Sequence, residues 1–259
     1  MRDFKGKNKI VVKVGTSSLT FENGSLNLRK IESLARVITD IKNSGKEVVL
    51  VSSGAIGVGV SRLNLNSKPE DSPGKQAMAA IGQCQLMSIY DEFFRKYNQI
   101  VGQVLLTKDV VLNEKMNKNA VNTFIALLNY GIIPIVNEND TVSTDEIEFG
   151  DNDTLSAYVA NIMGADLLIM LTDIDGLYDK NPGEEGAKLI PEVRLITEHI
   201  RQMAGGAGSS RGTGGMITKL MAAEIAAKSK TKTVIVSGEE PALIYDVLDG
   251  AEIGTYFNL

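Results

Sequence analysis

The sequence predicts an α/β fold, a three-layer αβα sandwich with a mostly parallel central sheet. Short apolar runs alternate with longer segments of helical periodicity along the whole chain. The short runs are apolar on both faces, as is typical of parallel strands covered by helices. Polar and glycine-rich clusters follow these runs, where open α/β sheets bind ligands. A chain of 259 residues can form one large domain or two lobes on a shared sheet.

The alternation begins with an expected strand over 9–14, KIVVKV. A helix over 26–45 follows because apolar residues from Ile31 to Ile41 recur at helical spacing, and Gly45 is its predicted C-terminal cap. The later elements repeat this order. They are strand 47–54, helix 75–97, strand 100–106, helix 120–131, strand 132–136, helix 154–165, strand 166–172, helix 215–229 and strand 233–237.

Composition excludes several classes of function. The net charge is −5 and the pI about 5.1, with no block of like charges, so we expect neither a nucleic acid nor a membrane partner. No apolar run approaches the roughly 18 residues of a spanning helix, and Lys13 interrupts the N-terminal apolar stretch. We therefore expect an unprocessed, soluble, cytoplasmic protein.

The chain has one cysteine and one histidine, so few catalytic or metal-binding schemes based on these residues are possible. Cys84 is the single cysteine, which excludes an internal disulfide, and its Ala/Met/Leu-rich surroundings predict a small core residue. His199 is the single histidine and lies in LITEHIRQM, an expected surface helix. Any catalysis by histidine would depend on that one residue, which we predict to be structural.

Glycine-rich turns follow predicted strands at three places: KVGTSS (13–18), SSGAIGVG (52–59) and GTGGMITK (212–219). Each alone could be a tight turn, but backbone N–H groups together with lysines in two of the three indicate phosphate binding. Neither the P-loop spacing nor the complete dinucleotide fingerprint occurs. The usual NTPase and Rossmann dehydrogenase folds are therefore excluded.

Lys13 is unusual because its strand would bury a charge without a partner. Asp153, at the start of the helix over 154–165, is the candidate partner and could hold two ammonium groups. A helix cap is the simpler interpretation of one such aspartate. However, NENDT (137–141) and GDNDT (150–154) hold more Asn and Asp than capping needs.

Six motifs carry a resemblance to a known family: VVKVGTSSL, VLVSSGAIGVG, IPIVNENDTV, GDNDTLSA, LLIMLTDIDGLY and GTGGMITKLMAA. In order and content they resemble the amino acid kinase family, and within it the kinases of free glutamate. The resemblance implies ATP-dependent phosphorylation of the γ-carboxylate of L-glutamate to L-glutamyl 5-phosphate, which begins proline biosynthesis. It implies a substrate lobe over about 1–165, a nucleotide lobe over about 166–259, and the form without a C-terminal RNA-modification-type (PUA) domain.

The resemblance also implies roles for individual residues. Lys13 and Lys219 would flank the transferred phosphoryl group, and Asp153 would orient them. The residues implied for glutamate binding are Ser53, Gly54, Asn137, Asp140 and Asn152. Those implied for nucleotide binding are Lys13, Gly15, Thr172, Asp173, Thr213, Gly214, Gly215, Met216, Ile217, Thr218 and Lys219.

Mg²⁺ is expected to arrive with ATP, so no residues are assigned to a metal. A homo-oligomer and feedback inhibition by proline are further implications of the family. Two alternatives remain open. The first is a kinase of the same fold for another acidic acceptor, such as N-acetylglutamate, carbamate or a nucleotide. The second is a non-catalytic amino-acid sensor, which we would expect to have lost Lys13, Lys219 or Asp153.

Overall fold

A computed structural model of the chain describes residues 1–259 except 5, 22–23, 143–151 and 206–214. Its strands are β1 (Lys9–Val14), β2 (Glu47–Val51), β3 (Val101–Leu106), β4 (Ile133–Glu138), β5 (Leu167–Thr172), β6 (Glu192–Val193), β7 (Lys232–Ser237) and β8 (Thr255–Phe257). Its helices are α1 (Thr16–Leu19), α2 (Leu28–Asn43), α3 (Ala55–Arg62), α4 (Ser72–Lys96), α5 (Lys108–Leu112), α6 (Glu114–Asn129), α7 (Asn152–Met163), α8 (Glu198–Gly205), α9 (Met216–Ala227) and α10 (Leu243–Leu248).

The strands form one sheet in the order β3-β4-β2-β1-β5-β7-β8-β6. Neighbouring strands run parallel except β7 and β8, which pair antiparallel. The predicted fold class is confirmed. The short strands β6 and β8 were not predicted, because two or three residues carry too little periodicity to be recognised.

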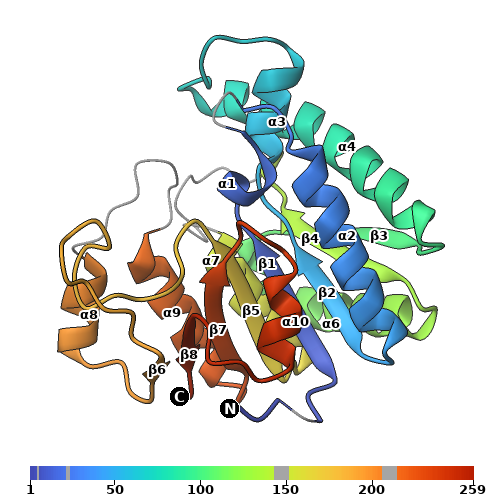
Figure 1. Cartoon of the computed structure of the whole chain (residues 1–259). Helices are drawn as coiled ribbons and strands as arrows, with labels where there is room; N and C mark the ends of the chain where they lie inside the picture. The colour runs from blue at the N-terminus through green and yellow to red at the C-terminus, as the bar shows by residue number, and fades with distance from the viewer. Residues whose placement is uncertain (5, 22–23, 143–151, 206–214) are drawn as a thin grey trace.

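Helices cover both faces of the sheet and make three layers (Figure 1). One core packs α6, α7 and α9 on the sheet, and the other packs α2, α4 and α10 on the opposite face. The predicted stripe on α2 is confirmed, since its residues from Ile31 to Ile41 at helical spacing are buried. Gly45 follows the helix with φ +88°, as expected of a C-terminal cap.

Part of the second glycine-rich segment, 52–59, proves to be helix α3. A Cβ added at Gly59 would lie 2.1 Å from the backbone oxygen of Met78 on α4. A Cβ added at Gly82 would lie 1.8 Å from the backbone oxygen of Ala55 on α3. These two glycines therefore let α3 and α4 approach closely, a packing role distinct from the phosphate binding predicted for the segment 52–59.

Two smaller expectations have opposite outcomes. The prediction that Cys84 belongs to the core is wrong, because it lies on an exposed face of α4. Gly82, Gln83 and Leu86 lie on the buried face of α4, and Cys84 lies on the opposite, exposed face. His199 lies exposed on α8, as predicted. Over the described part of the chain, none of the helices combines the length and apolar character needed to span a bilayer.

The sheet places the polar clusters together. β1 lies between β2 and β5, and all three run parallel, so their carboxyl ends meet at one edge of the sheet. β4 ends at the same edge beside β2. The ends of these four strands and the segments that follow them carry many of the residues expected to act on ligands.

Candidate active site

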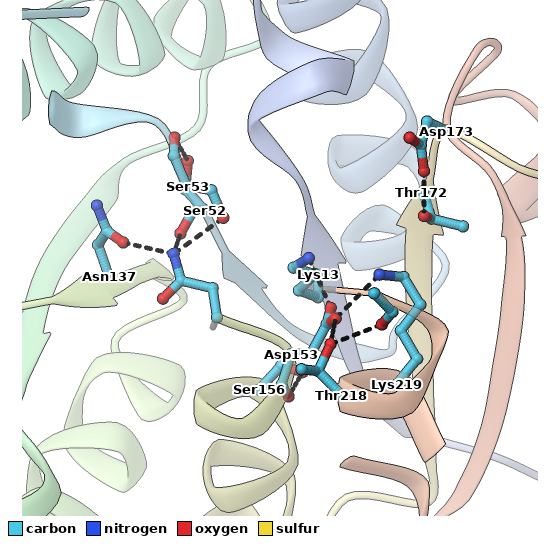
Figure 2. A network of polar contacts seen from close by, with 12 residues as sticks. Lys13, Ser52, Ser53, Asn137, Asp153, Ser156, Thr172, Asp173, Thr218 and Lys219 are labelled. Carbon is cyan, nitrogen blue, oxygen red and sulfur yellow. Dashed lines mark hydrogen bonds and ion pairs between the residues drawn. The ribbon is translucent and has the colours of Figure 1, made fainter. Parts of the chain in front are cut away.

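Two lysines from distant parts of the chain converge on one carboxylate. Lys13 Nζ, from the end of β1, lies 2.6 Å from Asp153 Oδ1. Lys219 Nζ, from the first turn of α9, lies 3.0 Å from Asp153 Oδ2. Figure 2 shows both ammonium groups pointing to the start of α7. The structure therefore brings together the three residues expected to carry catalysis, which we call the ion cluster.

The side chains of the ion cluster are almost completely buried from solvent. Asp153 is fully buried, and Lys13 and Lys219 are 3% and 5% exposed. Burial alone would raise the pKa of Asp153, but the two ammonium groups hold that pKa well below its usual range. The cluster thus combines two positive charges with one negative charge. Its net positive charge suits an anionic ligand.

Two hydroxyl groups hold Asp153 in place. Thr218 Oγ1 lies 3.0 Å from Asp153 Oδ2 and 2.8 Å from the carbonyl oxygen of Gly215. Ser156 Oγ donates to the backbone oxygen of Asp153 at 2.6 Å. Thr218 was expected at the nucleotide, and in the structure it contacts the carboxylate that holds both lysines.

A second cluster, neutral and built on amides, surrounds the side chain of Asn152. Its Nδ2 lies 2.8 Å from the carbonyl oxygen of Ser52, 2.9 Å from Ser53 Oγ and 3.0 Å from Asn137 Oδ1. Figure 2 shows this group beside β2 and β4, apart from the ion cluster. Ser53, Asn137 and Asn152, all expected at the substrate, are thus in contact, and we call them with Ser52 the amide cluster.

Helix α7 joins the two clusters because Asn152 and Asp153 are its first two residues. The Asn152 side chain reaches the amide cluster, and the Asp153 side chain reaches the ion cluster. Asp153 therefore does more than cap a helix. The repeated Asn-Asp pair in the sequence reflects two adjacent polar sites.

Gly54 and Asp140 lie close in sequence to members of the amide cluster: Gly54 follows Ser53, and Asp140 lies three residues after Asn137. Asp140 lies two residues beyond β4 and is partly buried. Burial raises the pKa of Asp140, and the positive charge of Lys68 partly opposes that rise. Gly54 is the N-cap of α3 with φ +93°, a conformation that favours glycine.

The residues expected at the nucleotide lie at the ends of β1, β5 and the start of α9. Gly15 follows β1, and a Cβ there would lie 3.6 Å from Lys13 Nζ. Thr172 ends β5, and its hydroxyl donates to Asp173 Oδ1 at 2.9 Å. Gly215 precedes α9, whose first residues are buried Met216 and exposed Ile217. Thr213 and Gly214 lie outside the described residues.

Sequence reasoning missed two residues of α4 behind the amide cluster. Gln83 Oε1 accepts from Asn137 Nδ2 at 2.8 Å, and the Tyr90 hydroxyl lies 2.9 Å from Ser52 Oγ. Both side chains are buried. The signal available was polarity within an apolar stripe at helical spacing, since Gln83 and Tyr90 alternate with buried Ala79 and Leu86.

A fixed metal centre finds no support among the residues that the structure describes. No group of three or more His, Cys, Asp or Glu side chains there could hold an ion. Asp153, the carboxylate at the centre, is already shared by two lysines.

Comparison with known proteins decides the family. Residues 8–237 match the sequence profile described as "Amino acid kinase family". This chain belongs to the amino acid kinase family. The family expected from six motifs is thereby confirmed over most of the chain.

Relatives within the amino acid kinase family are similar along nearly the whole chain. A "Glutamate 5-kinase" of Clostridium perfringens is 58% identical, over 98% of this chain and 96% of that protein. A "Glutamate 5-kinase" of Listeria welshimeri is 52% identical over 98% and 94%, respectively. One of Lactiplantibacillus plantarum is 50% identical over 99% and 98%.

Solved structures of two other kinases share the fold. A carbamate kinase from Giardia lamblia bound to AMP-PNP superimposes with a TM-score of 0.69 at 16% identity, over 99% of both chains. An isopentenyl phosphate kinase from T. acidophilum in a product complex gives 0.66 at 17% identity, over 96% of this chain and all of that one. At such low identity these likenesses bear on the architecture alone.

Proposed function

We propose that this amino acid kinase transfers the γ-phosphoryl group of ATP to the γ-carboxylate of L-glutamate. The product is L-glutamyl 5-phosphate, and the reaction is the first step of proline biosynthesis. Relatives that are 50–58% identical over nearly the whole chain are named for this activity. The observation that carries the proposal is the pair of clusters joined by Asn152 and Asp153 at the start of α7.

The reaction requires stabilisation by positive charge more than it requires a general base. A glutamate carboxylate has a pKa near 4.3 and is already ionised at neutral pH, so no proton has to be removed. A carboxylate oxygen forms a bond to the γ-phosphorus while the bond to the ADP oxygen breaks. Negative charge then spreads over the equatorial oxygens, and fixed cations stabilise it.

The ion cluster provides such cations at fixed positions. Lys13 and Lys219 are attached to β1 and α9, and Asp153 holds both ammonium groups within 3.0 Å. Because they are prearranged, little reorganisation is needed when charge develops. We assign these lysines to the transferred phosphoryl group and Asp153 to their orientation.

The amide cluster fits the amino-acid end of the substrate. An ammonium group needs acceptors, and Asn152, which Asn137 orients, and the carboxylate of Asp140 can supply them. Ser53 and the backbone near Gly54 offer donors for a carboxylate. We therefore assign glutamate to the ends of β2 and β4, and ATP to Gly15, Thr172, Asp173 and the segment Thr213–Lys219.

Mg²⁺ enters this proposal as part of the substrate MgATP. Mg²⁺ keeps much of its water and binds few carboxylates in phosphoryl-transfer sites, so ATP phosphates can hold it. The same proposal divides the chain near residue 165. β1 to β4 would serve glutamate, and β5, β7 and the start of α9 would serve the nucleotide.

The first test is turnover of L-glutamate by the purified protein with MgATP. ADP release is measured with hydroxylamine present, which traps an acyl phosphate as its hydroxamate. N-acetylglutamate, aspartate and carbamate are run in parallel. Glutamate-dependent ADP and hydroxamate in equal amounts are expected.

Other outcomes of this assay select other functions. Turnover with N-acetylglutamate or carbamate alone would make the chain a kinase of another acidic acceptor. No turnover with any acceptor, together with a rise in the melting temperature on adding glutamate or proline, would favour a sensor. A homo-oligomeric state and inhibition by proline rest on the family alone, cytoplasmic location rests on the sequence, and all three stay predictions.

A further inference from the structure

We propose that Gln83 is a positioning residue for the amino group of the substrate, acting through Asn137 and Asn152. The inference rests on the proposed function, since it assumes that the amide cluster binds glutamate. It adds a residue of α4 that lies behind the cluster. Three side-chain amides form one hydrogen-bonded chain, and its last oxygen is left for a ligand.

The chain of amides starts at Gln83, which is buried on α4. Gln83 Oε1 accepts a hydrogen bond from Asn137 Nδ2 at 2.8 Å. This contact uses the amide nitrogen of Asn137. The Asn137 oxygen therefore points away from α4.

A backbone group fixes the same orientation of Asn137. Its Oδ1 accepts from the backbone N–H of Glu138 at 2.9 Å, and a backbone N–H can only donate. Rotating the amide by half a turn would put its NH₂ group against that N–H. Asn137 Oδ1 is thus held where it accepts from Asn152 Nδ2 at 3.0 Å.

The same reasoning applies to Asn152. Its Nδ2 also meets the carbonyl oxygen of Ser52 at 2.8 Å, which can only accept. The amide nitrogen of Asn152 therefore faces Ser52 and Asn137. Its oxygen faces the other way.

The Asn152 oxygen is the last group in this series of hydrogen-bonded amides. Asn152 Oδ1 is buried, and the described residues offer it no hydrogen-bond partner. A buried acceptor left unpaired costs about 1–3 kcal/mol, so such a group is expected to meet a ligand donor. Asn137 donates to Gln83 and accepts from Asn152, and the hydrogen bonds that Asn152 donates through its NH₂ polarise its Oδ1 further. Its partner should be a cationic N–H donor, such as the α-ammonium group.

Gln83→Met is the variant that tests this role. Methionine keeps the length of the side chain and removes the acceptor, so Asn137 loses one of the bonds that orient it. We expect KM for L-glutamate to rise about tenfold. The inhibition constant of glutarate, which lacks the ammonium group, should stay within twofold, as should KM for MgATP.

Gln85→Met, two residues along the same helix, is the matched control and should leave all three constants unchanged. If Gln83→Met gives no folded protein, Gln83→Asn withdraws the amide by one methylene and should show the same selective loss. Equal losses for glutamate and glutarate, or no loss for glutamate, would overturn the role of Gln83. Absence of glutamate turnover in the unsubstituted protein would instead remove the proposed function, and this inference with it.

Discussion

The two clusters at the start of α7 lie on consecutive residues and differ in how they are stabilised. The ion cluster holds three buried charges, whereas the amide cluster is uncharged and joined by hydrogen bonds that, within the described part of the chain, leave only Asn152 Oδ1 unpaired among its side-chain amides. Buried charges are tolerated only when paired, whereas neutral amides lose less when one partner is removed. Charge is concentrated where phosphoryl transfer is proposed, and neutral groups lie where glutamate binding is proposed.

The largest effect should separate the neighbours Asp153 and Asn152. Asp153→Ala leaves two buried ammonium groups without their carboxylate and should lower the free energy of unfolding by about 3–5 kcal/mol. Asn152→Ala leaves only neutral acceptors unpaired and should cost about 1–3 kcal/mol. Urea unfolding of both variants measures the difference. Equal losses would contradict the distinction between the clusters.

Lys219→Ala should act on turnover. The ammonium group is assigned to the charge that develops during transfer, so kcat should fall by about 10²–10³ while KM for glutamate changes little. Lys228→Ala, an exposed lysine at the end of the same helix, is the control and should leave kcat unchanged. A change confined to KM would show that Lys219 binds substrate without assisting transfer.

Asp140→Asn should act on substrate binding and should sharpen the contrast with Lys219. Removing the charge that pairs with an ammonium group should raise KM for glutamate about tenfold and leave kcat within a few-fold. Asp91→Asn, at an exposed position of α4, is the control. An unaltered KM would remove Asp140 from the substrate site.

The pH dependence of KM for glutamate gives an independent check on the role of Asp140. Burial raises the pKa of Asp140, and only its ionised form carries the charge that attracts an ammonium group. KM for glutamate in the unsubstituted protein should therefore rise as pH falls through this raised pKa. In Asp140→Asn only the titration of glutamate itself should remain. Parallel pH profiles for the two proteins would argue against the role of Asp140.

The smallest effect is expected at Tyr90, which supports the amide cluster from behind. Tyr90→Phe removes the hydroxyl that contacts Ser52 and should lower the free energy of unfolding by about 1–2 kcal/mol. For a chain of this size the melting temperature should fall by a few degrees. KM for MgATP should not change. A larger loss than for Asp153→Ala would reverse the proposed ranking of the clusters.

The sequence predicted what depends on strong local contrasts. Lys13 stood out because a charge in an apolar strand needs a partner, and Asp153 is that partner in the structure. Gln83 did not stand out, because its role depends on how α4 packs beside β4. The exposure of Cys84 was missed for the same reason, since composition does not tell which face of a long helix meets the sheet. Packing between distant elements decided both.

A rigid helix that begins with Asn152 and Asp153 also has a consequence for ligand affinity. Any displacement of α7 that follows occupation of one cluster must move the neighbouring side chain in the other. Glutamate and MgATP should therefore influence one another's dissociation constants even where they do not touch. Thermodynamic linkage requires the influence to be reciprocal, so the factor by which glutamate changes nucleotide affinity must equal the factor in the opposite direction. Two titrations, each with and without the other ligand, would give this coupling factor twice.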